Sequence, residues 1–99
     1  MKMHQENKVL TVFLTGEIDH HSAKALRQAA DDALMRGRPE QLVLDFSGVT
    51  FMDSSGVGLV MGRYKTARAL DCAVTVKGLR PRDQKIMQMS GLTKLVMFQ

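Results

Sequence analysis

The chain has 99 residues, of which 44% are hydrophobic, and a formal net charge of +4 at pH 7. This length suits one hydrophobic core, so we expect a single domain over residues 1–99, and the hydrophobic share excludes a disordered chain. No apolar run approaches the roughly 20 residues that span a bilayer. The polar residues 4–7 leave no room for a signal peptide.

The N-terminal third predicts a strand followed by a helix. Residues 8–16 (KVLTVFLTG) are rich in β-branched and large apolar side chains and end at a glycine, which is typical of a strand. Residues 3–6 (MHQE) indicate a short edge strand before it. Asp19 and Ser22 are candidate caps for a helix whose apolar residues recur at helical spacing until Gly37.

The middle of the chain predicts a second strand, a helix and a third strand. Residues 41–46 (QLVLDF) are apolar on both faces except at Asp45, so we expect this strand to be covered on both sides. SGVTFM then turns toward a helix over residues 54–70, whose apolar residues form one stripe. Residues 72–78 (CAVTVKG) predict the next strand.

The C-terminal part predicts one more helix and one more strand. Pro81 suits the first turn of a helix that ends at Ser90-Gly91, and residues 94–98 (KLVMF) predict the last strand. Alternation of strands and helices indicates an α/β fold. We expect a central, mostly parallel sheet of four to five strands flanked by three to four helices.

The charge distribution bears on nucleic-acid binding, and the cysteine content bears on the cellular compartment. The basic residues lie in separate segments: Arg36 and Arg38, Arg63, Lys65 and Arg68, and Arg80 and Arg82. They have few aromatic neighbours on which bases could stack, so solvated surface charge is the better interpretation than a nucleic-acid site. A single cysteine cannot form an internal disulfide, which fits a reducing compartment, and we expect a cytoplasmic protein.

Two polar segments are expected at the same edge of the sheet. Residues 15–22 (TGEIDHHS) and 47–56 (SGVTFMDSSG) both follow strands, and functional groups of parallel sheets gather at the carboxyl ends of the strands. Within D-S-S-G at 53–56, the side chains could simply cap the following helix. Gly56 and Gly58 are harder to explain by capping, because glycine inside a helix costs about 1 kcal/mol. They indicate a close approach to the backbone.

Phosphorylation fits the physical setting of Ser54 or Ser55. A phosphoserine carries about −1.5 to −2 charges, and a helix N-terminus stabilises an anion by about 0.3–1 kcal/mol. The fold should therefore tolerate the phosphate. A partner that docks at this edge should not, because like charges brought together in an interface cost several kcal/mol.

Other chemistries at this turn have less support. His20 or His21 could serve as a base for Ser54 in a small hydrolase, but the sequence has no G-x-S-x-G elbow. The histidines and the cysteine lack zinc-like spacing, so we expect no metal and no cofactor. The turn also lacks the G-K-[ST] of a P-loop, which leaves only a weak nucleotide contact at the helix N-terminus as an alternative.

Three segments resemble a known family. LTGEIDHHSA (14–23), LVLDFSGVTFMDSSGVGLVMGRYK (42–65) and MSGLTKLVMF (89–98) are similar to the STAS-domain anti-sigma factor antagonists of the sporulation type. The resemblance implies a regulator that is not an enzyme. It implies that the unphosphorylated form binds an anti-sigma factor that is also a serine kinase, which frees the sigma factor for transcription, and that a PP2C-type phosphatase reverses the phosphorylation.

The resemblance also implies roles for particular residues. The phosphoacceptor is the first serine of D-S-S-G, Ser54, and the aspartate of the neighbouring loop, Asp19, lies close to it. The other residues implied near the phosphoacceptor or on the partner-facing surface are His20, His21, Asp53, Ser55, Gly56, Arg63, Tyr64 and Lys65. An alternative within the same family is a partner-switching module of a stress-response circuit or of another signalling circuit.

Overall fold

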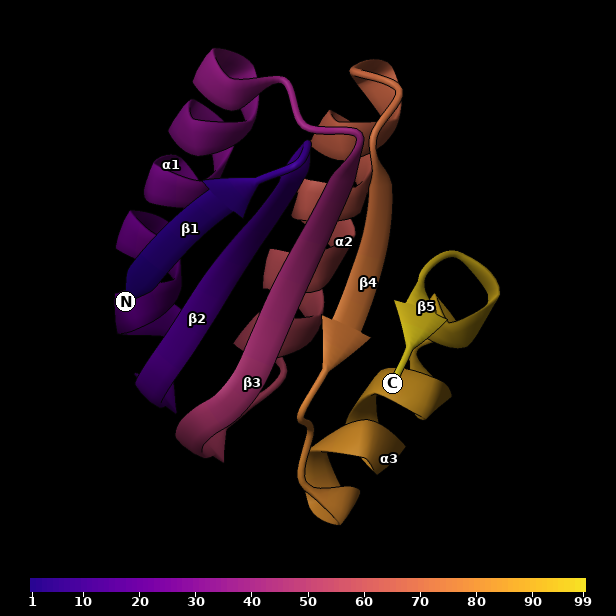
Figure 1. Cartoon of the computed structure of the whole chain (residues 1–99). Helices are drawn as coiled ribbons and strands as arrows, with labels where there is room; N and C mark the ends of the chain where they lie inside the picture. The colour runs from indigo at the N-terminus through magenta and orange to yellow at the C-terminus, as the bar shows by residue number, and fades with distance from the viewer.

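Strands and helices alternate along the chain in the computed structural model, which describes all residues from Met1 to Gln99 (Figure 1). The elements are β1 (Lys2–Glu6), β2 (Val9–Ile18), α1 (His20–Gly37), β3 (Gln41–Met52), α2 (Ser55–Ala69), β4 (Ala73–Lys77), α3 (Pro81–Met89), the short 3-10 helix η1 (Leu92–Lys94) and β5 (Met97–Phe98). The strands form one sheet in the order β1-β2-β3-β4-β5. Only β1 is antiparallel to its neighbour, which confirms the predicted α/β fold with a mostly parallel sheet.

The hydrophobic core lies between the sheet and the pair α1–α2, which Figure 1 shows behind the strands. Alternate residues of the central strands point into it and are buried: Leu10, Val12 and Leu14 of β2, and Leu42, Leu44 and Phe46 of β3. Buried residues of the helices, such as Leu34 of α1 and Val60 of α2, meet them. Both helices connect neighbouring parallel strands, so they run the same way and begin at the same edge of the sheet.

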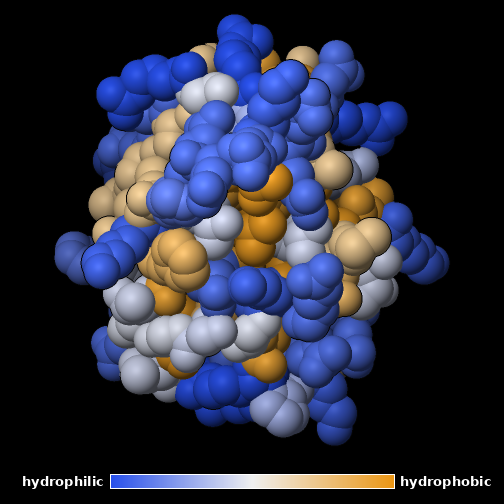
Figure 2. Space-filling model, viewed as in Figure 1, coloured by the Kyte–Doolittle hydropathy of each residue, from blue (hydrophilic) through white to orange (hydrophobic).

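The other face of the sheet carries no helix, which corrects the expectation that residues 41–46 are covered on both sides. Figure 2 looks onto this face and shows apolar patches separated by polar side chains. Gln41 and Val43 are half-buried there, and Gln41 Nε2 donates a hydrogen bond of 2.9 Å to Thr75 Oγ1 on β4. Asp45 accepts hydrogen bonds from the backbone and hydroxyl of Ser47. Polar side chains on this face therefore bond to one another and partly cover the strands from solvent, in place of a helix.

Strands β2 and β3 are longer than predicted. They continue to Ile18 and Met52, which lie opposite each other after two register shifts, so SGVTFM is strand rather than turn. The Asp53 N–H then donates to the Ile18 carbonyl over 3.1 Å. The two polar segments are thus neighbours at one edge, as predicted.

The C-terminal part contains the predicted helix and a shorter strand. Helix α3 begins at Pro81, and Arg80 just before it donates to Asp83 Oδ2 and to the Thr50 carbonyl of β3. The strand predicted over residues 94–98 is limited to Met97–Phe98. The chain turns at Gly91 with φ +82°, η1 includes Lys94, and the N–H groups of Leu95 and Val96 donate to the Leu92 carbonyl. No helix of the protein combines the length and the apolar character needed to cross a membrane.

Candidate functional site

The start of α2 leaves the Ser54 hydroxyl free. Asp53 Oδ1 accepts the Ser55 N–H over 2.7 Å, and the Asp53 carbonyl accepts the Gly56 N–H over 3.0 Å. Ser54 has near-helical dihedral angles, makes no capping hydrogen bond through its side chain and is exposed. Asp53 is therefore the residue that caps α2, and the Ser54 hydroxyl makes no hydrogen bond that the fold depends on.

The start of α1, at the same edge, is closed by a complete capping box. Asp19 Oδ1 accepts the Ser22 N–H over 2.8 Å, and the Asp19 N–H donates to Ser22 Oγ over 3.1 Å, as expected for this pair of caps. The hydrogen bond from the Ser22 backbone is the main reason why the pKa of Asp19 is lowered. Asp19 and Asp53 each follow one member of the opposed pair Ile18 and Met52, so two acidic residues lie at the edge of the sheet where α2 begins.

Gly56 and Gly58 differ in what surrounds them. A Cβ atom at Gly56 would lie 2.4 Å from Sδ of the buried Met52, so the expected close approach to the backbone occurs there. A Cβ atom at Gly58 would have no atom of this chain within 4 Å, so no internal contact requires glycine at that position. Glycine inside a helix still costs about 1 kcal/mol relative to alanine.

Beside Ser54, a hollow of about 430 Å³ lies between the first turns of α1 and α2. Its lining residues are His20, His21, Ala23, Lys24, Arg27, Ser55, Gly58 and Leu59. Neither histidine makes a hydrogen bond to Ser54 or Ser55. The hollow thus brings the predicted residues His20, His21 and Ser55 together, but not as a serine–histidine pair.

Sequence reasoning did not select two residues of this hollow, Lys24 and Arg27. Both are exposed side chains of α1. Their spacing from His20, four and seven residues, places all three on one face of a helix, and that pattern could have identified them. Basic residues on an amphipathic helix are usually solvated, so this pattern alone does not indicate a binding site.

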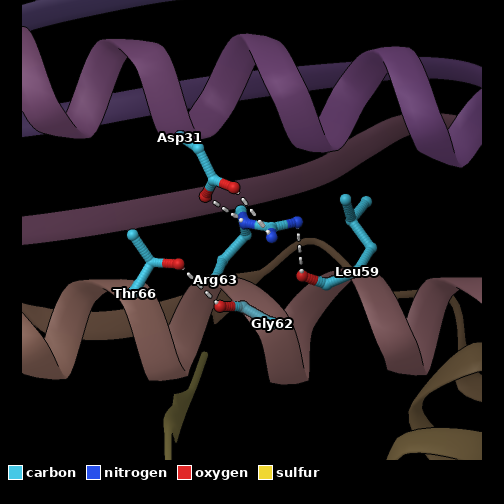
Figure 3. Close-up of polar contacts among 5 residues, drawn as sticks. All are labelled: Asp31, Leu59, Gly62, Arg63 and Thr66. Carbon is cyan, nitrogen blue, oxygen red and sulfur yellow. Dashed lines mark hydrogen bonds and ion pairs between the residues drawn. The ribbon is translucent and has the colours of Figure 1, made fainter.

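Arg63 does not lie on the partner-facing surface, which corrects the expectation for this residue. Figure 3 shows its guanidinium between the two helices, directed at Asp31 of α1. The side chain is 3% exposed, and its Nη2 donates to Asp31 Oδ2 over 3.1 Å. Nε lies 2.7 Å from Oδ1 as an ion pair without hydrogen-bond alignment. The sequence suggested an exposed Arg63 because its partner, Asp31, is 32 residues away and no local pattern links the two.

Tyr64 and Lys65 lie one to two turns beyond the hollow. The Tyr64 hydroxyl accepts a hydrogen bond of 3.0 Å from Arg68 Nη1, and its ring lines a different surface hollow beside β4 and β5. Lys65 is exposed. Neither residue lines the hollow beside Ser54, so their place in a partner surface stays a prediction.

Comparisons with known proteins agree with this architecture. A family model described as "Mlab, STAS domain" matches residues 1–97. An anti-sigma F factor antagonist of Paenibacillus polymyxa is 36% identical over 97% of this chain and 82% of its own length. An anti-sigma-B factor antagonist of Listeria monocytogenes is 28% identical over 88% of this chain and 75% of its own length. The solved structure of the Bacillus cell fate determinant SpoIIAA in its phosphorylated form superposes with a TM-score of 0.77 at 30% identity, covering 99% of this chain and 89% of that one.

Proposed function

The chain belongs to the STAS domain family and, within it, to the anti-sigma factor antagonists, and from this premise we propose that it is a binding switch controlled by phosphate on Ser54. The unphosphorylated chain binds an anti-sigma factor that is also a serine kinase. Binding displaces a sporulation sigma factor and frees it for transcription in the cytoplasm. The kinase transfers a phosphate to Ser54, which ends the interaction, and a PP2C-type phosphatase restores the binding form. The chain is then the substrate of an enzyme and has no catalytic role of its own.

The observation that carries this proposal is the free hydroxyl of Ser54. A kinase can reach it because the side chain is exposed, and its modification breaks no hydrogen bond because Asp53 caps the helix instead. A phosphate there sits at the N-terminus of α2, where an anion is favoured by about 0.3–1 kcal/mol. The similarity of the fold to a phosphorylated relative supports a scaffold that tolerates the modification.

The effect on binding is expected to be much larger than the effect on folding. Like charges brought together in an interface cost several kcal/mol, and Asp19 and Asp53 already make one side of this edge acidic. Ser54→Asp should therefore abolish measurable binding to the cognate anti-sigma factor while the Tm changes by only a few degrees. Isothermal titration calorimetry and thermal unfolding measure the two effects.

A phosphorylation assay tests the site assignment. Incubation with the cognate kinase and ATP should add one phosphate, which mass spectrometry maps to Ser54. Ser54→Ala should accept none and still bind the partner, whereas Ser55→Ala, the matched control, should be phosphorylated as the unmodified sequence is. A phosphate on Ser55 or Thr50 would contradict the assignment.

Similarity to an anti-sigma-B factor antagonist favours one alternative circuit, a stress-response or related signalling module. The same switch would then act on a different anti-sigma factor. Affinities for anti-sigma factors of the F type and of the B type, measured side by side, distinguish the two. Tighter binding to the B type would assign the chain to a stress-response module, and the proposed role of Ser54 would stay the same.

A further inference from the structure

The hollow beside Ser54 is cationic. Lys24 and Arg27 line it together with His20 and His21, and no acidic residue does. Neither Lys24 nor Arg27 takes part in an ion pair within the chain. Asp31, one of the two acidic residues of α1, is already bound to Arg63. The first turns of both helices also line the hollow, and the positive ends of the two helix dipoles add positive potential.

Gly58 indicates that the hollow is kept open for something outside the chain. Glycine weakens a helix, and at this position no atom of the chain would clash with a Cβ atom. The neighbouring Gly56 shows the contrast, because Met52 fills the space next to it. Unlike Gly62, which also has no atom close to a Cβ position, Gly58 lines the hollow, so its bare backbone leaves room there for an external group.

The lining favours protein side chains over a small molecule as the occupant. Sites for small ligands are lined mainly by apolar and aromatic side chains, whereas only Ala23 and Leu59 are hydrophobic here and the only rings are the imidazoles of His20 and His21. A nucleotide base would find no Phe, Tyr or Trp ring here and only these two imidazoles on which to stack. Carboxylates suit the site better, because Lys24 offers a point charge and Arg27 a planar fork of donors.

We propose that this hollow is the docking site for an acidic segment of the anti-sigma factor, with Lys24 and Arg27 as its main contacts. The inference rests on the proposed function and adds the chemistry of the partner surface. It also explains why phosphate on Ser54 ends binding. The residue next to it, Ser55, lines the hollow, so the new negative charge stands at the margin of the site that holds the partner's carboxylates.

The test measures the affinity of the unphosphorylated full chain for the purified cognate anti-sigma factor by isothermal titration calorimetry at low and high salt. Lys24→Ala with Arg27→Ala should weaken binding at least about tenfold and should reduce the salt dependence, because two attractive charges are lost. The matched control is Arg36→Ala with Arg38→Ala. These exposed residues at the other end of α1 have the same charge, and their removal should change the affinity by less than about twofold.

A second variant tests the shape of the hollow without removing charge. Gly58→Leu fills it and should also weaken binding at least about tenfold, with the Tm unchanged or higher because leucine favours a helix. Wild-type affinity in both the Lys24/Arg27 and the Gly58 variants would overturn the inference while leaving the proposed function in place. No binding by the wild-type chain would instead contradict the proposed function.

Titration of the chain alone with ATP tests the alternative that the hollow binds a nucleotide. Under the proposal, ATP binds weakly or not at all, and the Lys24→Ala and Arg27→Ala changes have no effect on it. ATP binding in the micromolar range that these two substitutions abolish would assign the hollow to a nucleotide and overturn the inference.

Discussion

Helices α1 and α2 enclose an open cationic hollow between their first turns, and further along they are joined by a buried ion pair. At the first turns, Lys24 and Arg27 are exposed and unpaired. Near the middle of the helices, Arg63 is 3% exposed and paired with Asp31. The same type of charge thus has two uses on one helix pair. Where the charge is buried and paired, it holds the helices together, and where it is exposed and unpaired, it is available to a partner.

The comparison extends to the two helix starts. Asp19 and Ser22 bond to each other and close the start of α1. At the start of α2, Asp53 caps the helix and Ser54 remains unbonded. Two similar motifs, D-H-H-S and D-S-S-G, therefore differ in how many of their polar groups the fold uses. The difference separates a serine whose side chain stabilises the helix start from one whose hydroxyl has no partner in the chain.

Loss of the buried pair should give the largest effect on stability. Arg63→Ala leaves Asp31 without its cation, and we expect a loss of about 3 kcal/mol in the free energy of unfolding, near the lower end for buried pairs because Asp31 is partly exposed. Urea denaturation followed by circular dichroism measures it. Arg68→Ala, an exposed control on the same helix, should change stability by less than about 0.5 kcal/mol. A change as small as this in the Arg63 variant would contradict a structural role.

Gly56 and Gly58 of α2 should respond in opposite directions to the same substitution. Gly56→Ala places a methyl group against buried Met52 and should destabilise the protein by about 1–3 kcal/mol. Gly58→Ala meets no atom and should stabilise it by about 0.4–1 kcal/mol. Denaturation midpoints of the pair provide the measurement. Equal effects would mean that Met52 readily moves aside.

A smaller difference is expected between the two neighbours at the start of α2. Asp53→Ala removes the cap and should cost about 0.5–2 kcal/mol. Ser54→Ala removes a hydroxyl that bonds to nothing in the chain and should stay within about 0.5 kcal/mol of wild type. Thermal unfolding of both variants tests the assignment, and the reverse order would show that Ser54 is the cap after all.

Acid sensitivity should arise from carboxylates with structural bonds. Partial burial raises the pKa of Asp45, but hydrogen bonds from Ser47 and the charge of Lys77 outweigh it, and the net shift is downward. A carboxyl whose pKa is lowered by folding stabilises the protein above its unfolded pKa of about 3.9, and this contribution is lost as the pH falls through the folded pKa. Asp19 adds to the same trend.

The measurement is the Tm between pH 2 and 6 for wild type and Asp45→Asn. We expect the wild-type Tm to fall as the pH drops below about 4, and the fall to be shallower in the variant, because asparagine has no proton to bind. Parallel curves would show that Asp45 makes no contribution to the acid response.

Local signals allowed much of this fold to be predicted. The alternation of strands and helices and the caps at Asp19 and Ser22 depend on neighbouring residues and were correct. The burial of Arg63 depends on Asp31, far away in the sequence, and no local pattern reveals it. The shortened β5 likewise follows from the 3-10 turn at η1, whose residues also fit a strand pattern.

The site was predicted less completely than the fold. Its location followed from topology, because parallel strands β2 and β3 must end at the same edge. Ser54 was selected as a candidate because the sequence around it resembles a family motif, and only the structure shows that its hydroxyl makes no capping hydrogen bond. Lys24 and Arg27 became noticeable only with the hollow between the helices, which neither helix forms alone.

Capping by Asp53 has a consequence for how such a regulator can be retuned. The side chain at position 54 makes no capping hydrogen bond, because Asp53 caps the helix. We therefore expect substitutions at this position to leave the surrounding structure unchanged. Under the proposed function, alanine there would leave the regulator permanently active, and aspartate would leave it permanently inactive, with the same fold. A single substitution at position 54 would then be enough to change how the regulator responds.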